Sequence, residues 1–204
     1  MSRFNLKTGD LLLFDKGTEG LSGWLSSFIK YFTQSDITHV AMVLKDPYFI
    51  HPTLKGYYVW ESNWEGEPDP QDGKIKFGVQ VTPFDEIYKS YKSTNGRVYV
   101  RRIGSTTNPF SLDVMERIHE NVYNKMYDIV PSDWLEALWR RDSHPQKTDR
   151  FWCSALVGYI YTQCGILRPT VDWSILRPCD FSQDDATLEL QFTGIGLLGT
   201  QEAI

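Results

Sequence analysis

A cysteine and a histidine, far apart in the chain, are residue types that could carry out nucleophilic chemistry. Cys153 stands within Phe151 to Leu156, where an apolar helical pattern begins. His39 opens the apolar run Val40 to Val43, which has the pattern of a buried strand. A thiol at a helix start, together with a distant imidazole, is typical of a cysteine nucleophile and its general base.

The position of Cys153 provides a physical reason for its activation. Only the thiolate attacks well, and the first turn of a helix presents unpaired N–H groups and the positive end of the helix dipole. A nearby imidazolium would favour the thiolate further. The alternative is that Cys153 is a small buried hydrophobe, because free cysteines are among the most buried residues. Cys164 and Cys179 lack this context, and we interpret them as buried core residues.

Three further residues are candidates for the base and the orienting acid beside the thiol. His39 is the candidate base, because a ring at the mouth of a strand could face a cleft, and a purely structural histidine is the alternative. His51 is its nearest rival. Glu61 ends an aromatic run and is the candidate acid that would orient the imidazole through its second N–H. The alternative for Glu61 is an exposed acid at a strand end.

The composition describes a chain that can build one sizeable core. It has 204 residues, of which 41% are hydrophobic and 14% aromatic, so it is not a disordered chain. A net charge of −5 argues against sequence-independent nucleic-acid binding, which needs a basic face. Three cysteines without a CxxC pair suggest neither a disulfide framework nor a zinc site. We therefore expect no cofactor, no metal and no nucleic-acid partner.

The sequence also predicts an intracellular protein in a reducing, cytoplasmic compartment. Residues 1–7 lack the apolar core of a signal peptide. No stretch of 18 apolar residues occurs, so we expect no transmembrane segment. Residues 21–32 are apolar-rich but too short and contain serines. Peripheral contact with a membrane stays open.

The hydrophobic periodicity predicts one α+β domain over residues 1–204, with its core at about 9–168 and a C-terminal extension at about 180–204. The predicted strands are 9–14, 39–44, 57–61, 74–81 and 97–103, with strand-like patches at 48–51 and 187–192. The predicted helices are 21–30, one that starts at Thr82 as N-cap, 112–126, 132–140 and 152–164. The Gly-rich end of the chain is expected to fray.

Five short motifs in one order resemble a known family. They are Gly9-Asp10-Leu11-Leu12, Thr38 to Val43, Trp60-Glu61-Ser62, Tyr127-Asp128 and Cys153 to Val157. This order resembles the circularly permuted papain-like hydrolases of the NlpC superfamily, and most closely their YiiX-like and poxvirus-type branch. The match covers about residues 9 to 168. Here the histidine precedes the cysteine, the reverse of the order in papain, and permutation accounts for the reversal because a triad is defined by its geometry.

The resemblance implies a role for each motif residue. Cys153 would be the nucleophile, His39 the base and Glu61 the third, polar residue. Tyr127 would bind substrate or line the oxyanion site, and the Cys153 backbone N–H would be the other oxyanion donor. The relatives that act on lipids carry a second histidine about twelve residues after the first. His51 stands at that spacing and is the alternative third member.

The resemblance leaves three functions open. The first is a thiol hydrolase that cleaves a peptide or another amide through an acyl-enzyme. The second is a thiol acyltransferase or esterase that acts on an acyl lipid. The third is a non-catalytic binding or virion module on the same fold. Residues 129–150 are longer than a minimal connection, and Trp134 and Trp139 there either pack on the core or form a lid or partner contact. The substrate, the oligomeric state and a viral, bacterial or eukaryotic source are not determined by the sequence.

Overall fold

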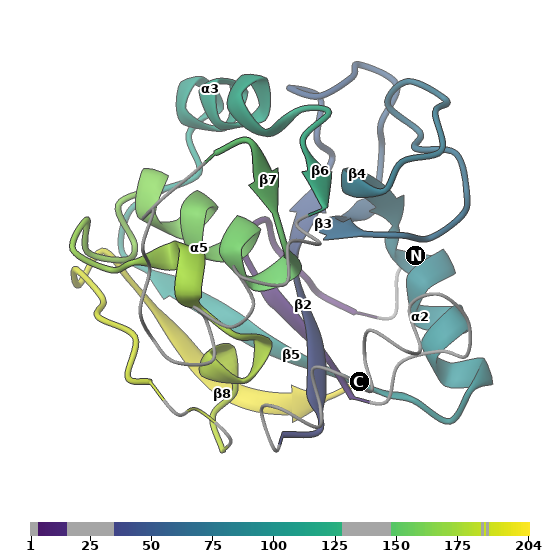
Figure 1. Ribbon diagram of the computed structural model, residues 1–204. Coiled ribbons are helices and arrows are strands. Elements are labelled where there is room, and N and C mark those ends of the chain that lie inside the picture. The colour runs from purple at the N-terminus through teal and green to yellow at the C-terminus, as the bar shows by residue number, and fades with distance from the viewer. Residues whose placement is uncertain (1–3, 16–34, 128–147, 185, 187) are drawn as a thin grey trace.

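A curled sheet lies at the centre of the molecule (Figure 1). The computed structural model describes residues 4–15, 35–127, 148–184, 186 and 188–204. Within these residues the sheet has eight strands in the order β7-β6-β4-β3-β2-β1-β5-β8, all antiparallel neighbours except the parallel pair β6 and β7. The strands are β1 Leu11–Asp15, β2 Ile37–Lys45, β3 Tyr57–Asn63, β4 Gly78–Pro83, β5 Arg97–Ser105, β6 Met126–Tyr127, β7 Arg150–Phe151 and β8 Gly196–Ala203.

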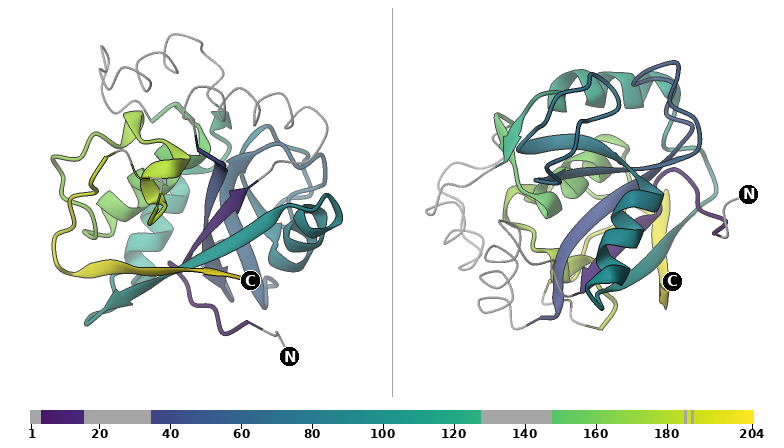
Figure 2. Two further views of the ribbon diagram at one scale, coloured as in Figure 1. Left: turned by 90° about the horizontal axis from the view of Figure 1, so that it is seen from below. Right: turned by 90° about the vertical axis from the view of Figure 1, so that its right-hand side faces the viewer.

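Helices cover both faces of this sheet, so the predicted α+β class is confirmed. The described helices are α2 Phe84–Ser93, α3 Leu112–Val122 and α5 Cys153–Gln163, with short 3-10 turns at η1 Trp173–Ile175 and η2 Pro178–Phe181. Figures 1 and 2 show α5 and α2 on opposite sides of the sheet. Because side chains alternate along a strand, Leu11 and Leu13 pack in the core beneath α5, while Leu12 and Phe14 pack in the core beneath α2.

Most predicted elements are present, with shifted ends. The strand expected at 74–81 begins only at Gly78, and the helix expected to reach 126 ends at Val122. Asn124 follows in the left-handed region at φ 57°, which a helix cannot continue through. The helices expected at 21–30 and 132–140, including Trp134 and Trp139, lie outside the described residues.

Three local predictions were wrong. Residues 48–51 form a turn, in which the Ile50 N–H donates to the Pro47 carbonyl. Of the patch at 187–192, the described residues 188–192 contribute a single bridge, between Leu167 and Phe192. The Gly-rich end does not fray but forms β8, whose backbone pairs with β5 from Ser105 to Tyr99. The sequence pattern does not predict β8, because backbone hydrogen bonds to a distant strand can form with any side-chain pattern on an edge strand.

The short strand β6 is held at its place by a close approach of two backbones at Gly78. The Tyr127 N–H donates to the Phe77 carbonyl at 3.0 Å, and the Val79 N–H donates to the Lys125 carbonyl at 2.9 Å. Gly78 has φ 148°, and a Cβ atom there would lie 2.2 Å from the Lys125 carbonyl oxygen. That oxygen belongs to the backbone and cannot turn away, so only glycine fits.

We therefore expect Gly78→Ala to lower the free energy of unfolding by roughly 3 kcal/mol, from backbone strain and overlap together. Gly73→Ala is the matched control, because Gly73 also has a positive φ, of 71°, but no heavy atom within 4 Å of its added Cβ. It should cost only about 1 kcal/mol. Chemical denaturation measures both, and equal losses would contradict the close-approach explanation.

Candidate active site

Cys153 is the first residue of α5, and several side chains hold this helix start in place. The Trp152 indole N–H and the Ser154 hydroxyl both donate to the Leu176 carbonyl, at 3.1 and 2.7 Å. The Ser62 hydroxyl on β3 donates to the Phe151 carbonyl at 2.6 Å. The Cys153 residue itself is 2% exposed. The thiol is thus fixed at the positive end of a buried helix.

His39 and Glu61 form a buried pair on neighbouring strands. His39 is near the start of β2, and Glu61 is in the second half of β3. The His39 Nε2 and Glu61 Oε2 atoms are 2.7 Å apart, and Glu61 is completely buried. Cys153 lies close enough to His39 for its charge and hydrogen-bonding to act on the imidazole. Because Nε2 faces Glu61, Nδ1 is the ring nitrogen that remains for the thiol. One imidazole therefore links the three residues.

The surroundings of His39 strongly favour its charged form. Burial lowers the pKa of His39, but the negative charge of a Cys153 thiolate and its hydrogen bond oppose burial, as do the hydrogen bond and charge of Glu61. Together they raise the pKa of His39 to about 10. The ring is then an imidazolium at neutral pH.

Two residues that the sequence analysis did not assign to the site hold the Glu61 carboxylate. The Thr82 hydroxyl donates to Glu61 Oε1 at 2.6 Å, and the Asn63 amide donates to Oε2 at 3.4 Å. Thr82 was predicted as a helix N-cap, but it lies in β4, and the N-cap is Pro83, which makes no side-chain cap. The signal that could have found Asn63 is the two-residue strand period, because Asn63 follows Glu61 by two positions.

His51 is not brought to His39. It lies in the turn after β2, where its Nδ1 atom is 2.8 Å from the Thr53 hydroxyl oxygen. Of the two predicted candidates for the third position, the structure brings Glu61 to the imidazole.

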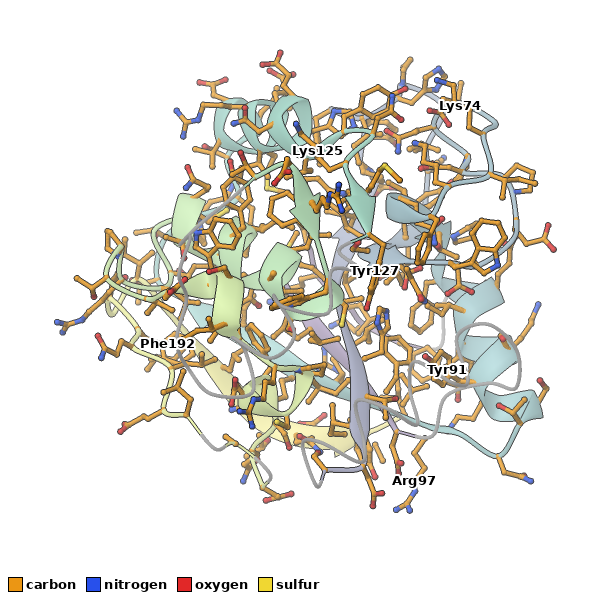
Figure 3. The ribbon with its side chains drawn as sticks, in the orientation of Figure 1. Lys74, Tyr91, Arg97, Lys125, Tyr127 and Phe192 are labelled. Atoms are coloured by element: carbon orange, nitrogen blue, oxygen red, sulfur yellow. The ribbon has the colours of Figure 1, made fainter. Side chains whose placement is uncertain are left out.

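Tyr127 lies beside the segment that leads into Cys153. It is 4% exposed and pairs on β6 with Phe151 of β7. Its ring stacks on Phe77 at 5.1 Å between centroids, and Phe77 contacts Trp64 edge-on at 6.1 Å. Trp64 and Phe77 are partly exposed. Figure 3 shows Tyr127 to the right of α5. An aromatic row, Trp64–Phe77–Tyr127, thus runs from the surface to the region of the thiol.

The other two cysteines are buried elsewhere. Burial raises the pKa of the Cys164 thiol, near the other end of α5, to about 12. Cys179 is completely buried in η2. None of the three cysteines forms a disulfide.

No protein-family model matches this chain, and no curated protein matches it. In the part of the chain that the structure describes, no three His, Cys, Asp or Glu side chains cluster in a way that could hold a metal ion. None of the helices among the described residues combines the length and the apolar character needed to cross a bilayer.

Proposed function

We propose that the protein is a thiol hydrolase that cleaves an amide bond through an acyl-enzyme on Cys153. The observation that carries the proposal is the single imidazole of His39, which pairs with Glu61 at 2.7 Å and is acted on by Cys153. A sheet packed against a helix that begins with the cysteine also supports the permuted papain-like fold that the sequence resembles.

The geometry supports the following chemistry. The Cys153 thiolate attacks the carbonyl carbon, and a tetrahedral oxyanion forms. The carbon–nitrogen bond then breaks, the His39 imidazolium donates its proton to the leaving amine, and a thioester remains on Cys153. Neutral His39 next takes a proton from water, which attacks the thioester. Release of the carboxylic acid restores the thiolate–imidazolium pair, while Glu61 keeps the ring in orientation throughout.

The oxyanion would accept hydrogen bonds from a backbone donor and a side-chain donor. The Cys153 N–H belongs to the first turn of α5, where N–H groups have no acceptor within the helix. Tyr127 is the proposed second contact, on the resemblance and on its place beside Phe151. Such donors stabilise the charge that develops in the transition state.

The test is to trap the acyl-enzyme. On mixing with p-nitrophenyl acetate, the protein should release nitrophenolate in a burst, and its intact mass should rise by one acetyl group on Cys153. Cys153→Ala should abolish both signals, because it removes the attacking sulfur, whereas Cys164→Ala should keep them. Acetylation that persists in Cys153→Ala would contradict the proposal.

The raised pKa of His39 predicts the alkaline limit of activity. The imidazolium supplies the proton for the leaving amine, so kcat/KM should hold up to about pH 9 and fall as pH rises through about 10. In Glu61→Gln, the alkaline fall of kcat/KM should move to lower pH, because Glu61 is one of the groups that raise the pKa of His39. If kcat/KM of the wild type already falls near the ordinary histidine pKa of about 6.5, the assignment of His39 as the proton donor is contradicted.

A second candidate function is acyl transfer from or to a lipid. The observation that favours it is the exposed apolar edge beside Tyr127, where Trp64 is 38%, Phe77 36% and Met126 59% exposed. Such side chains can enter the interfacial region of a bilayer. Flotation with phosphatidylcholine vesicles tests it: the protein should float with the vesicles, and Trp64→Ser should weaken this. Protein that stays at the bottom of the gradient argues for hydrolysis alone.

A further inference from the structure

Glu65 is a second carboxyl group beside the candidate active site, and the mechanism above does not use it. It follows β3 and is half-buried. Its Oε1 atom accepts a hydrogen bond of 2.5 Å from the Asn63 amide nitrogen, and the same nitrogen donates to Glu61 Oε2. The two carboxyl groups therefore share one donor. The Asn63 amide carries no charge, and the positive His39 already pairs with Glu61.

Glu65 differs from the other acids of its loop. Asp69 is buried and balanced, because Lys76 Nζ lies 2.8 Å from its Oδ2 and the Gln71 side chain donates to the same oxygen. Glu67 is exposed to solvent. Among the residues that the structure describes, no lysine or arginine nitrogen lies within 4.0 Å of the Glu65 carboxylate. Glu65 is thus the acid of this loop that lies beside Glu61 and has no lysine or arginine partner in that part of the chain.

The groups that face Glu65 come from three elements. Glu61 lies on β3, His39 on β2 and Tyr91 on α2. The charges of Glu65, Glu61 and Cys153 all act on the Tyr91 hydroxyl. Burial and the charge of Glu61 raise the pKa of Glu65 to about 8, against the opposing effects of His39 and the Asn63 hydrogen bond. A cation that arrived there would displace the proton and pair with the carboxylate.

We propose that Glu65 binds a cationic group of the substrate, an ammonium or a guanidinium, on the Glu61 side of the candidate site. This inference rests on the proposed function, because it names the substrate class of the same site. The shared Asn63 donor leaves room on the Glu65 carboxylate for a charged donor. A cation there would also balance the second negative charge beside Glu61, which makes Glu65 a specificity residue.

Charge-matched thiol reagents test this without knowledge of the substrate. Methyl methanethiosulfonate is neutral, and its 2-(trimethylammonio)ethyl analogue carries a permanent positive charge. Both form a disulfide with the thiolate and release methanesulfinate. The measured quantity is the ratio of the cationic to the neutral rate constant at Cys153, followed by mass spectrometry. At pH 8.5, Glu65→Gln should lower this ratio about tenfold, because a unit charge several ångströms away is lost.

Three further results are expected. Glu67→Gln, the matched control on the same loop, should leave the ratio unchanged. Glu65→Asp should retain part of the cationic preference, because it keeps the charge. In wild type the ratio should fall from pH 8.5 to pH 7, because Glu65 gains its proton, and in Glu65→Gln it should not.

The outcomes separate this inference from the proposed function. A ratio that Glu65→Gln leaves unchanged, or that Glu67→Gln lowers equally, would overturn the role of Glu65 while the reactive thiol stands. If the neutral reagent modifies Cys153 no faster than Cys164, the proposed function itself fails.

Discussion

Iodoacetamide should modify Cys153 at least about a hundredfold faster than Cys164 at pH 7, because only thiolates react and the two environments are opposite. The positive charge of His39 and the positive end of α5 both lie at Cys153. Burial raises the pKa of Cys164 to about 12, so almost none of it is ionised at pH 7. Both residues are under 10% exposed, so access alone does not explain such a difference. Peptide mass spectrometry over a time course measures both rates.

The control for this prediction is the imidazole. His39→Asn keeps a polar side chain on β2 but removes the positive charge, and it should slow the alkylation of Cys153 by about tenfold or more. The rate at Cys164 should not change, because Cys164 lies near the far end of α5. Equal alkylation of the two cysteines in wild type would contradict the assignment of Cys153 as nucleophile.

Replacement of Glu61 by Gln should lower kcat/KM by up to about 10⁴-fold, the loss found when the aspartate of a triad becomes an amide. The variant keeps the size of the side chain and can still accept from Thr82. It loses the carboxylate that pairs with His39 Nε2 at 2.7 Å, so it no longer stabilises the imidazolium or its orientation. Steady-state kinetics on the best ester or amide substrate measure the loss.

Matched variants separate this role from a general loss of structure. His51→Gln should leave kcat/KM unchanged, because His51 contacts Thr53 and not His39. Thr82→Val removes one hydrogen bond to Glu61 and should have a smaller effect, of up to about tenfold. Thermal unfolding of each variant shows whether the fold is kept. If kcat/KM falls as far in His51→Gln as in Glu61→Gln, the assignment of Glu61 as the third residue of the triad is contradicted.

Features with a local cause were predictable from the sequence. β2 is an apolar run because both faces of the central sheet are covered, so nearly every side chain of Ile37–Lys45 is buried. The end of α5 was predictable because Gly165, at φ 70°, supplies the left-handed residue that stops a helix. The order of the Cys153, His39 and Glu61 motifs was sufficient to select these three residues as candidates.

Features that depend on strand register could not be predicted in this way. Trp60 pairs with Val81, which sets Thr82 close enough to bond Glu61. Nothing in the residues around Thr82 reveals this, and its position before a proline pointed instead to a helix cap. The edge strand β8 is a similar case, because its partner β5 lies about a hundred residues earlier.

The sequence by itself determined which residue types could do chemistry: a thiol at a helix start, an imidazole at a strand start and an acid at a strand end. Hydrophobic period and capping act over a few residues, so these elements are readable locally. Only the tertiary structure decided that Glu61 rather than His51 meets the imidazole, that Asn63 and Thr82 hold Glu61, and that Glu65 stands beside it. Those contacts depend on how distant strands align, and burial then sets the charges of the groups that meet.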